Sequence, residues 1–205
     1  MLRFISERTG IVRLFVALLL SERVRAGLAR VQAKLARTCE KVRWIPSEQL
    51  HLTVKFLGEV AESDVTAVSE ALARASLRAA PCTMEIACTG CFPSSGPVRI
   101  VWAGARDTPK ALDQCVETVT SELAQIGFAP ERRPWSAHIT LGRVRDDRTG
   151  GRIRAAVDAM SLEAMEQPVE AVTLMSSVLS AKGPTYAVVS SASLGSGDSR
   201  ARDRD

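Results

Sequence analysis

Apolar residues along this chain recur at two spacings, and each spacing predicts a different element. Apolar and polar residues alternate at the start of HLTVKFLG, residues 51–58, which predicts a half-buried β-strand. Residues 22–37 instead carry apolar side chains three or four positions apart, as in an amphipathic helix. The other predicted helices cover 62–77, 108–126 and 152–160, and the other predicted strands cover 13–20, 82–88, 99–105, 138–144, 169–180 and 185–194.

The order of these elements contains a duplication. A strand, a helix and a histidine-led strand occur twice, and 38 positions separate Arg13 from His51 while 39 separate Arg99 from His138. The strand lengths and their alternation with helices favour antiparallel sheets, each with one helix-covered face. We therefore expect an α+β, bilobal fold, in which two largely antiparallel sheets are related by a pseudo-two-fold axis. A central cleft should lie between the lobes, with the helices on the outer faces.

Both histidines of the chain open a strand with the same pattern of imidazole, aliphatic, hydroxyl and aliphatic side chains. The two copies are HLTV, with His51 and Thr53, and HITL, with His138 and Thr140. Side chains two residues apart on a strand share a face. Each motif should therefore present an imidazole and a hydroxyl together to whatever lies above its sheet.

The alternation along the first motif also assigns the neighbouring side chains. Leu52, Val54 and Phe56 should form the apolar face that lies on a core, while Lys55 extends the polar row beyond Thr53 as a solvated residue.

Composition sets outer limits on the function. The chain has 205 residues, 46% hydrophobic and 24% charged, with a formal net charge of +4, as expected of a soluble globular protein. The modest positive charge permits an anionic substrate without requiring one. The longest apolar run, LFVALLL, is too short to span a bilayer, and the five scattered cysteines do not form a secreted disulfide framework. We expect a cytoplasmic protein without membrane contact.

Two imidazoles on opposite sides of a cleft suit in-line displacement at phosphorus. One ring can take a proton from the attacking oxygen while the other gives a proton to the leaving oxygen, and this chemistry needs no metal. The threonine hydroxyls could donate hydrogen bonds to the nonbridging phosphate oxygens.

The paired motifs resemble those of the two-histidine phosphoesterase superfamily, in its 2′-5′ RNA ligase or RNA 2′,3′-cyclic phosphodiesterase branch. The flanking segments are similar too, in the same order, so the resemblance covers about residues 12–194. They read VRLFVAL, VRWIPSEQLHLTVKFLGEV, GFAPERRPWSAHITLGRV and SVLSAKGPTYAVV.

The resemblance implies a hydrolase that opens RNA 2′,3′-cyclic phosphate ends to 2′-phosphates, with no cofactor, acting as a monomer. It makes His51 the proton donor to the 3′ oxygen and His138 the acceptor that activates water. Thr53 and Thr140 would hold the phosphate, and Arg143 matches a family arginine that contacts phosphate. The same site could instead perform 2′-5′ RNA ligation or act on cyclic nucleotides.

Simpler interpretations remain for several of these residues. The protein could be a non-catalytic binder of RNA ends, or the histidines could share a zinc ion with a cysteine or carboxylate. Arg143 could be an ordinary surface charge, and the three tryptophans could be core residues or base-stacking surfaces. Cys88 and Cys91 have the spacing of half a zinc site, but no second pair follows, which favours ordinary cysteines.

The chain ends are predicted to lie outside the fold. Residues 1–11 show neither helical nor strand periodicity and are expected to be an extension, while residues 195–205 are polar and of mixed charge, which is typical of a disordered tail. Residues 12–194 should form a single bilobal domain.

Overall fold

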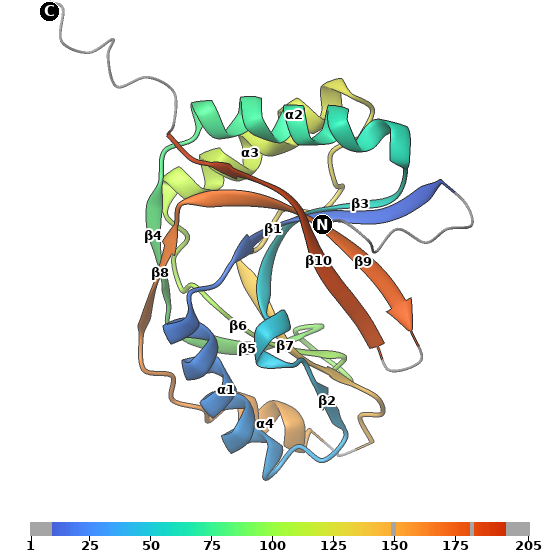
Figure 1. Ribbon diagram of the computed structural model, residues 1–205. Coiled ribbons are helices and arrows are strands. Elements are labelled where there is room, and N and C mark those ends of the chain that lie inside the picture. Colours follow the sequence, from blue (N-terminus) through green and yellow to red (C-terminus); the bar gives the residue numbers. More distant parts are fainter. Residues whose placement is uncertain (1–9, 149–150, 181–182, 196–205) are drawn as a thin grey trace, which may run out of the picture.

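The computed structural model describes residues 10–148, 151–180 and 183–195, which form an α+β fold (Figure 1). The helices are α1 (Glu22–Ala36), α2 (Val65–Arg78), α3 (Lys110–Gln125) and α4 (Arg152–Asp158), with short 3-10 turns at Ser47–Gln49 and Glu62–Asp64. The strands are β1 (Ile11–Leu19), β2 (Val42–Trp44), β3 (His51–Ala61), β4 (Cys82–Ile86), β5 (Cys88–Phe92), β6 (Ile100–Gly104), β7 (His138–Val144), β8 (Met165–Val169), β9 (Ala171–Ser180) and β10 (Gly183–Ser193).

The main sheet consists of two antiparallel halves that meet at one seam. Its strands lie in the order β10, β9, β1, β3, β7, β6, β5, and β2 pairs with β7 on a branch of this path. The first lobe contains β10, β9, β1 and β3, and the second contains β7, β6, β5 and β2. At the seam β3 pairs with β7 through Leu52 and Ile139. The bilobal arrangement expected from the duplicated sequence pattern is therefore present.

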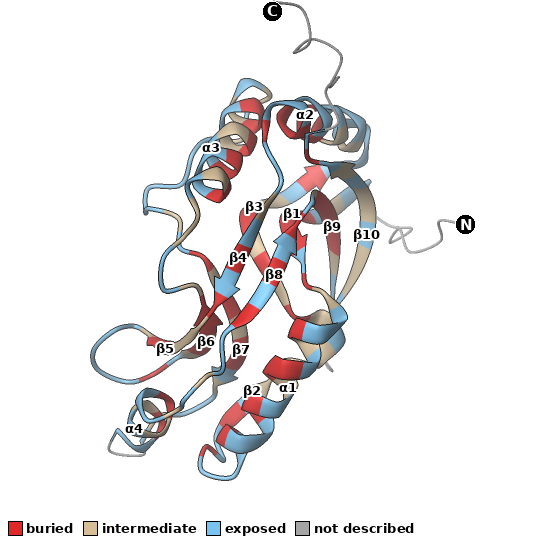
Figure 2. Ribbon diagram, turned by 90° about the vertical axis from the view of Figure 1, so that its left-hand side faces the viewer, coloured by how far each residue is buried: buried red, intermediate tan, exposed pale blue. Residues whose placement is uncertain are grey.

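Helices lie on the outside of this sheet, as predicted. Figure 1 shows α2 and α3 together at one end of the molecule and α1 and α4 at the other, and Figure 2 shows their buried residues turned toward the strands. In α1, the buried residues Val24, Leu28, Val31 and Leu35 repeat at the spacing read from the sequence. The side chain of Ser21 caps this helix by accepting a hydrogen bond from the backbone N–H of Val24.

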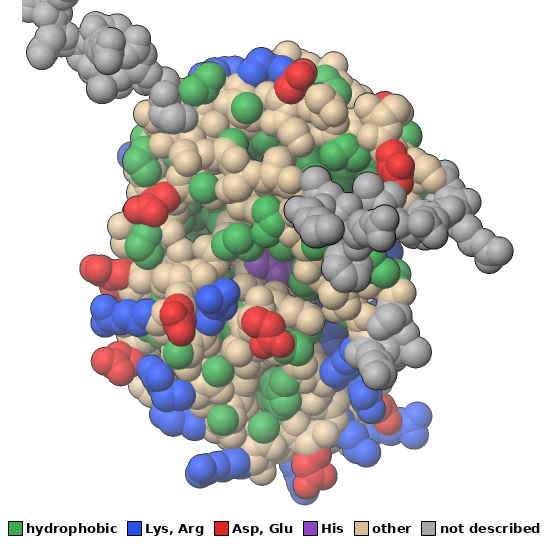
Figure 3. Space-filling model, viewed as in Figure 1, with side chains coloured by type: hydrophobic (Ala, Val, Ile, Leu, Met, Phe, Trp, Pro, Cys, Tyr) green, Lys and Arg blue, Asp and Glu red, His purple; other side chains and the backbone are tan. Residues whose placement is uncertain are grey.

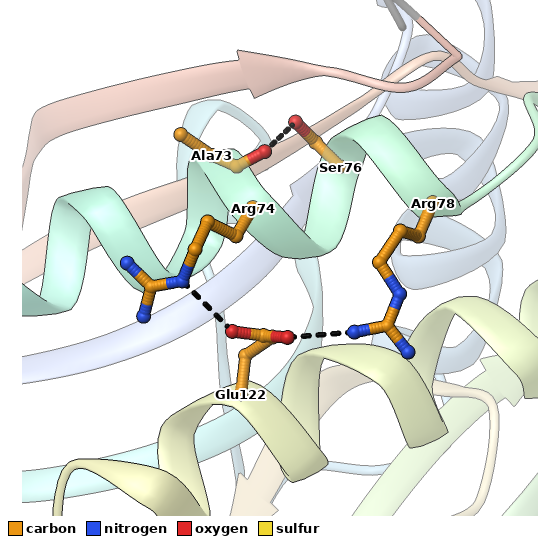
Figure 4. Close-up of polar contacts among 5 residues, drawn as sticks. All are labelled: Ala73, Arg74, Ser76, Arg78 and Glu122. Carbon is orange, nitrogen blue, oxygen red and sulfur yellow. Dashed lines mark hydrogen bonds and ion pairs between the residues drawn. The ribbon is translucent and has the colours of Figure 1, made fainter.

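One carboxylate joins the two helices at the first end. Glu122 of α3 is buried, and its two oxygens accept hydrogen bonds from Arg74 at 3.0 Å and Arg78 at 2.7 Å on α2 (Figure 4). The arginine side chains remain 49% and 62% exposed, so their charges stay hydrated while they neutralise the buried carboxylate.

Two β-bulges correct the sequence-based assignment of faces along β3. The register between β1 and β3 pairs Ala17 with Thr53 but Val16 with Lys55, so Val54 is an extra residue in β3. Between this bulge and the second one, at Leu57, the alternation is inverted. Lys55 is therefore buried with its ammonium group donating to the carbonyl of Ala129 at 2.6 Å, and Phe56 is 62% exposed instead of lying in the core.

Several predicted boundaries also shift. The segment predicted as one strand over residues 82–88 bends at Ala87 and supplies β4 to a small sheet with β8 and β5 to the main sheet. Likewise β8 ends at Val169, so the strand expected from residue 169 begins at Ala171 as β9. The third helix, expected from residue 108, begins at Lys110, with Pro109 at its N-cap position.

The predicted chain ends fall largely outside the described residues. Of the expected extension over 1–11, residues 1–9 lie outside them, and β1 begins at Ile11. Of the expected tail over 195–205, only Gly195 is described.

Candidate active site

The two histidines lie on either side of the seam between the lobes. His51 and His138 are the first residues of β3 and β7, and the pair that joins these strands, Leu52 and Ile139, follows them directly. An antiparallel register through that pair sets His51 opposite Thr140 and His138 opposite Thr53. The two motifs therefore interleave across the seam.

A cleft of about 1160 Å³ opens over this seam and is lined by both histidines and both threonines. Figure 3 shows the histidine side chains in a hollow at the centre of this face. Thr53 and Thr140 are half-buried, and among the described residues neither hydroxyl makes a hydrogen bond to another side chain or backbone group. Both hydroxyls are thus available to a ligand in the cleft.

Each imidazole is held by the same local hydrogen bond. Nδ1 of His51 lies 2.8 Å from the carbonyl oxygen of Gln49, and Nδ1 of His138 lies 3.0 Å from the carbonyl oxygen of Ser136. A carbonyl oxygen can only accept, so Nδ1 carries the proton and donates in both rings. In the neutral form of each ring Nε2 then holds a lone pair, and in the charged form Nε2 holds a transferable proton.

Aromatic rings surround the histidines, more closely on the first lobe. The ring of His51 lies 5.0 Å from that of Phe15 and 5.2 Å from that of Tyr186, which also contact each other at 5.1 Å. His138 has Phe92 edge-on at 5.0 Å. None of these three aromatic residues was identified from the sequence, because Phe15 lies inside an apolar run and the other two belong to distant strands.

The surroundings of His51 disfavour its charged form. Burial is the main factor that lowers the pKa of His51 below its ordinary value of 6.5, although the hydrogen bond to Gln49 acts in the opposite direction. The positive charges of Arg143 and His138 lower the pKa further. These charge effects indicate that Arg143 and both imidazoles act on the same small region of the cleft.

A bulge in β7 brings Arg143 to the cleft. The register between β6 and β7 pairs Val101 with Gly142 but Trp102 with Thr140, so Leu141 is an extra residue. Simple alternation from His138 would turn Arg143 to the opposite face, and the bulge reverses this. Arg143 is exposed and lines the cleft, where a guanidinium group can hold a phosphate.

Two tryptophans and the loop before β7 complete the cleft wall. The indole N–H of Trp135 donates to the carbonyl of Thr53 at 3.0 Å and so ties the approach to β7 to the histidine strand of the other lobe. Trp44 also lines the cleft, whereas Trp102 stacks on Phe92 at 5.3 Å. Lys55, which is buried and bonded to the carbonyl of Ala129, is not one of the residues that line the cleft.

The cysteines do not gather near the histidines. The thiol of Cys88 donates to the carbonyls of Gly104 and Ala105, and burial raises the pKa of Cys91 to about 11. A thiol with that pKa stays protonated at neutral pH and is a poor metal ligand. Within residues 10–148, 151–180 and 183–195, no group of three or more His, Cys, Asp or Glu side chains could hold a metal ion.

No helix in the same part of the chain is long and apolar enough to cross a membrane.

Known proteins are similar to this chain in sequence and in fold. An RNA 2′,3′-cyclic phosphodiesterase of Thermus thermophilus is 35% identical over 191 residues, covering 89% of this chain and 90% of that protein. A protein of the same description from Methanothermobacter thermautotrophicus is 31% identical and covers 85% of this chain and 95% of its own length. The crystal structure of Escherichia coli LigT complexed with 3′-AMP superimposes with a TM-score of 0.71 at 28% identity, over 90% of this chain and 98% of that one.

The family resemblance read from the paired motifs is confirmed at the level of the whole fold. The sequence model of the family described as LigT like Phosphoesterase matches residues 18–102 and 104–186, which include both histidine strands and the seam between them. The chain belongs to the LigT-like phosphoesterase family.

Proposed function

We propose that this protein hydrolyses the 2′,3′-cyclic phosphate ends of RNA to 2′-phosphates, using His51 and His138 and no metal ion. The observation that carries the proposal is the matched pair of imidazoles in one cleft, each donating from Nδ1 to a backbone carbonyl. This arrangement leaves two Nε2 atoms for proton transfer. The descriptions of the relatives as RNA 2′,3′-cyclic phosphodiesterases support RNA as the substrate class.

The reaction needs one neutral and one charged ring. Nε2 of His138 takes a proton from a water molecule, and the water oxygen attacks phosphorus. As the bond from phosphorus to O3′ breaks, Nε2 of His51 gives its proton to O3′, which leaves a 3′-hydroxyl and a 2′-phosphate. The net result moves one proton from His51 to His138, and exchange with solvent restores the starting state.

Three further side chains stabilise the charge on the phosphate oxygens. The hydroxyls of Thr53 and Thr140 donate to nonbridging oxygens, and Arg143 adds a positive charge that does not depend on pH. These groups are held by strands rather than loops, so they are oriented before the substrate arrives, which is the condition for electrostatic catalysis.

The lowered pKa of His51 is compatible with the donor role in the bound state. A cyclic phosphodiester brings one negative charge next to the ring, and this charge opposes the effects of burial, Arg143 and His138 on the pKa of His51 in the free protein.

The donor role is tested by His51→Ala with a substrate that carries a better leaving group at the 3′ position. Activity should recover in this variant if His51 is the donor, whereas recovery confined to His138→Ala would reverse the two roles.

The function is tested directly with an oligoribonucleotide that ends in a 2′,3′-cyclic phosphate. We expect conversion to the 2′-phosphate at the same rate with and without excess chelator, with the product resolved from its 3′ isomer by chromatography. Activity abolished by chelator and restored by zinc would contradict the proton-transfer mechanism. Binding without turnover would identify an RNA-end binder, and a 2′-5′-linked product formed in the presence of a 5′-hydroxyl RNA would identify ligation.

A further inference from the structure

Gln32 is a buried polar residue on the apolar face of α1. It is 7% exposed, and the large side chains buried beside it on this face are aliphatic. Burying an amide costs free energy unless its polar atoms are hydrogen-bonded, so an aliphatic side chain would suit the packing of this helix better. The reason for a glutamine here lies in what its amide contacts.

The amide of Gln32 binds two backbone carbonyls of the second lobe. Nε2 donates to the carbonyl oxygen of Ile45 and to that of Leu141, both at 2.8 Å. An amide nitrogen has two N–H donors, so both are used. Ile45 follows the last residue of β2, and Figures 1 and 2 show α1 beside this strand. One side chain thus joins α1, the end of β2 and β7.

Leu141 is the extra residue of the bulge in β7. It interrupts the pairing with β6 between Val101 and Trp102, so its backbone depends on partners outside that strand. Its carbonyl accepts a second hydrogen bond, from the N–H of Ile45 at 2.9 Å. Without the bulge, Arg143 would fall on the opposite face of β7. The two donors therefore stabilise the backbone conformation that carries Arg143 to the cleft.

Charge adds a reason for this support. Arg143 stands directly opposite Arg43 in the register of β2 and β7, and both side chains line the cleft. Like charges directly opposite each other on paired strands destabilise the pairing. The ladder is short, since β2 has three residues and ends at Trp44, next to the carbonyl that Gln32 binds. Gln32 thus holds the end of a short ladder that carries two repelling guanidinium groups.

We propose, resting on the proposed function, that Gln32 is a positioning residue that keeps Arg143 at the cleft. It fixes the bulge at Leu141 and the end of β2 from a helix on the outside of the sheet. The described residues that line the cleft do not include Gln32. Gln32 therefore acts on a bound phosphate through Arg143 and not by direct contact.

A double-mutant cycle tests the coupling of Gln32 to Arg143. Gln32→Met keeps the length of the side chain but removes both donors, and Arg143→Gln removes the charge. On an oligoribonucleotide that ends in a 2′,3′-cyclic phosphate, Arg143→Gln should lower kcat/KM by about 10- to 150-fold, the effect of one hydrogen bond to a charged group. Gln32→Met should lower it by up to about 10²-fold, as a misplacement of about 1 Å does.

The two losses should not multiply. In the Arg143→Gln background, Gln32→Met should change kcat/KM by no more than about 2-fold, because the group that it positions is already gone. A double variant that shows the product of the two single losses would overturn the proposal, as would a Gln32→Met variant with the kcat/KM of the wild type.

The pKa of His51 supplies a measurement that does not depend on turnover. Burial is the main factor that lowers this pKa, and the positive charge of Arg143 lowers it further. Gln32→Met and Arg143→Gln should therefore both raise the pKa of His51, and the double variant should raise it no more than Arg143→Gln alone. NMR can follow the titration, because the chain has two histidines. All variants keep the other charged or titratable groups beside His51 in the cleft, which are His138, Tyr186 and Arg13.

Gln167→Met is the matched control. Gln167 of β8 is also buried, and its amide bonds to the backbone N–H of Ser21 and the carbonyl of Leu19, but it does not line the cleft. Both methionine variants leave buried backbone groups without a partner, so both should lower the thermal midpoint. Gln167→Met should leave kcat/KM and the pKa of His51 unchanged. If Gln32→Met does not fold, Gln32→Asn tests the same contacts, because its amide is one methylene too short to reach both carbonyls.

An unmoved pKa of His51 in the Gln32 variant, or equal effects of the two methionine variants on this pKa and on kcat/KM, would contradict the positioning role. The expected pKa changes in a protein that does not open cyclic phosphates would support the positioning role while contradicting the proposed function.

Discussion

Gly104 sets the position of His138, and replacing it with alanine should separate activity from stability. Gly104 lies opposite His138 in the register of β6 and β7. A Cβ at this position would press against the carbonyl oxygen of Ala137, the residue before His138, and would contact the ring of Trp102 at 3.4 Å. The obstacle on the β7 side is backbone, so a rotamer change of a flexible side chain cannot relieve it.

The size of the effect follows from the geometry. The Ala137 carbonyl would have to move away by about 1 Å, and misplacements of that size at an active site lower rates by about 10²-fold. Such a movement displaces the backbone of His138, which follows Ala137 directly, and with it the imidazole. It also disturbs the Ser136 carbonyl, which orients the ring by accepting from Nδ1. Overpacking should also lower the free energy of unfolding by about 1–3 kcal/mol.

A second glycine variant supplies the control. Gly127 has φ of +98°, and no atom lies within 4 Å of the place that a Cβ would take, so Gly127→Ala introduces backbone strain without pressing on the cleft. We expect it to lower the free energy of unfolding by about 1–2 kcal/mol while leaving turnover unchanged. Turnover on a cyclic-phosphate oligonucleotide and chemical denaturation should be measured for both variants. Wild-type turnover by a folded Gly104→Ala protein would refute the placement of His138 in the reaction.

Other predictions concern protonation and the helix pair. The acidic limb of the kcat/KM profile should have its midpoint below 6.5, because activity is lost once both rings are charged and the pKa of His51 is lowered mainly by burial. Arg143→Gln should move this limb toward higher pH, since the variant removes a positive charge that opposes protonation of His51; an unmoved limb would assign it to another group. Glu122→Ala should lower the free energy of unfolding by about 1–2 kcal/mol, because two partly exposed arginines lose their shared carboxylate. Asp146→Ala, which breaks a pair with Arg148 whose side chains are 52% and 90% exposed, should change it by less than about 0.5 kcal/mol, and equal losses in the two variants would contradict this ranking.

The sequence predicted those features that depend on local periodicity. The amphipathic helices, the order of the strands and the shared face of each histidine with its threonine follow from spacing alone, because side-chain direction repeats with a fixed period in each element. The spacing of the duplicated segments also indicated that the two histidine strands would occupy equivalent places. The seam at Leu52 and Ile139 brings them together.

Features that depend on a partner strand were beyond local reasoning. The bulge at Val54 is defined only by the register with β1, and it exchanges the predicted environments of Lys55 and Phe56. The bulge at Leu141 has the opposite consequence for the prediction. Alternation alone places Arg143 away from the cleft, so its assignment to the site rested on the resemblance to the family.

Residues contributed by distant elements were missed for the same reason. Tyr186 reaches His51 because β10 and β9 pair beside β1, and Phe92 reaches His138 from β5 at the other edge of the sheet. In the sequence Tyr186 is a single aromatic residue in a predicted strand and Phe92 lies outside the predicted strands, and no spacing connects either residue to a histidine.

The central claim is that His51 and His138 act together as proton donor and acceptor, and a double-mutant cycle tests it most directly. The catalytic efficiency of His51→Ala, His138→Ala and the double variant should be measured on an oligoribonucleotide that ends in a 2′,3′-cyclic phosphate. Each single variant should lose about 10²–10⁴-fold, and the double variant should lose far less than the product of the two losses, because both rings serve one step. Thermal midpoints should stay close to that of the wild type. Normal turnover by either folded single variant would contradict the account.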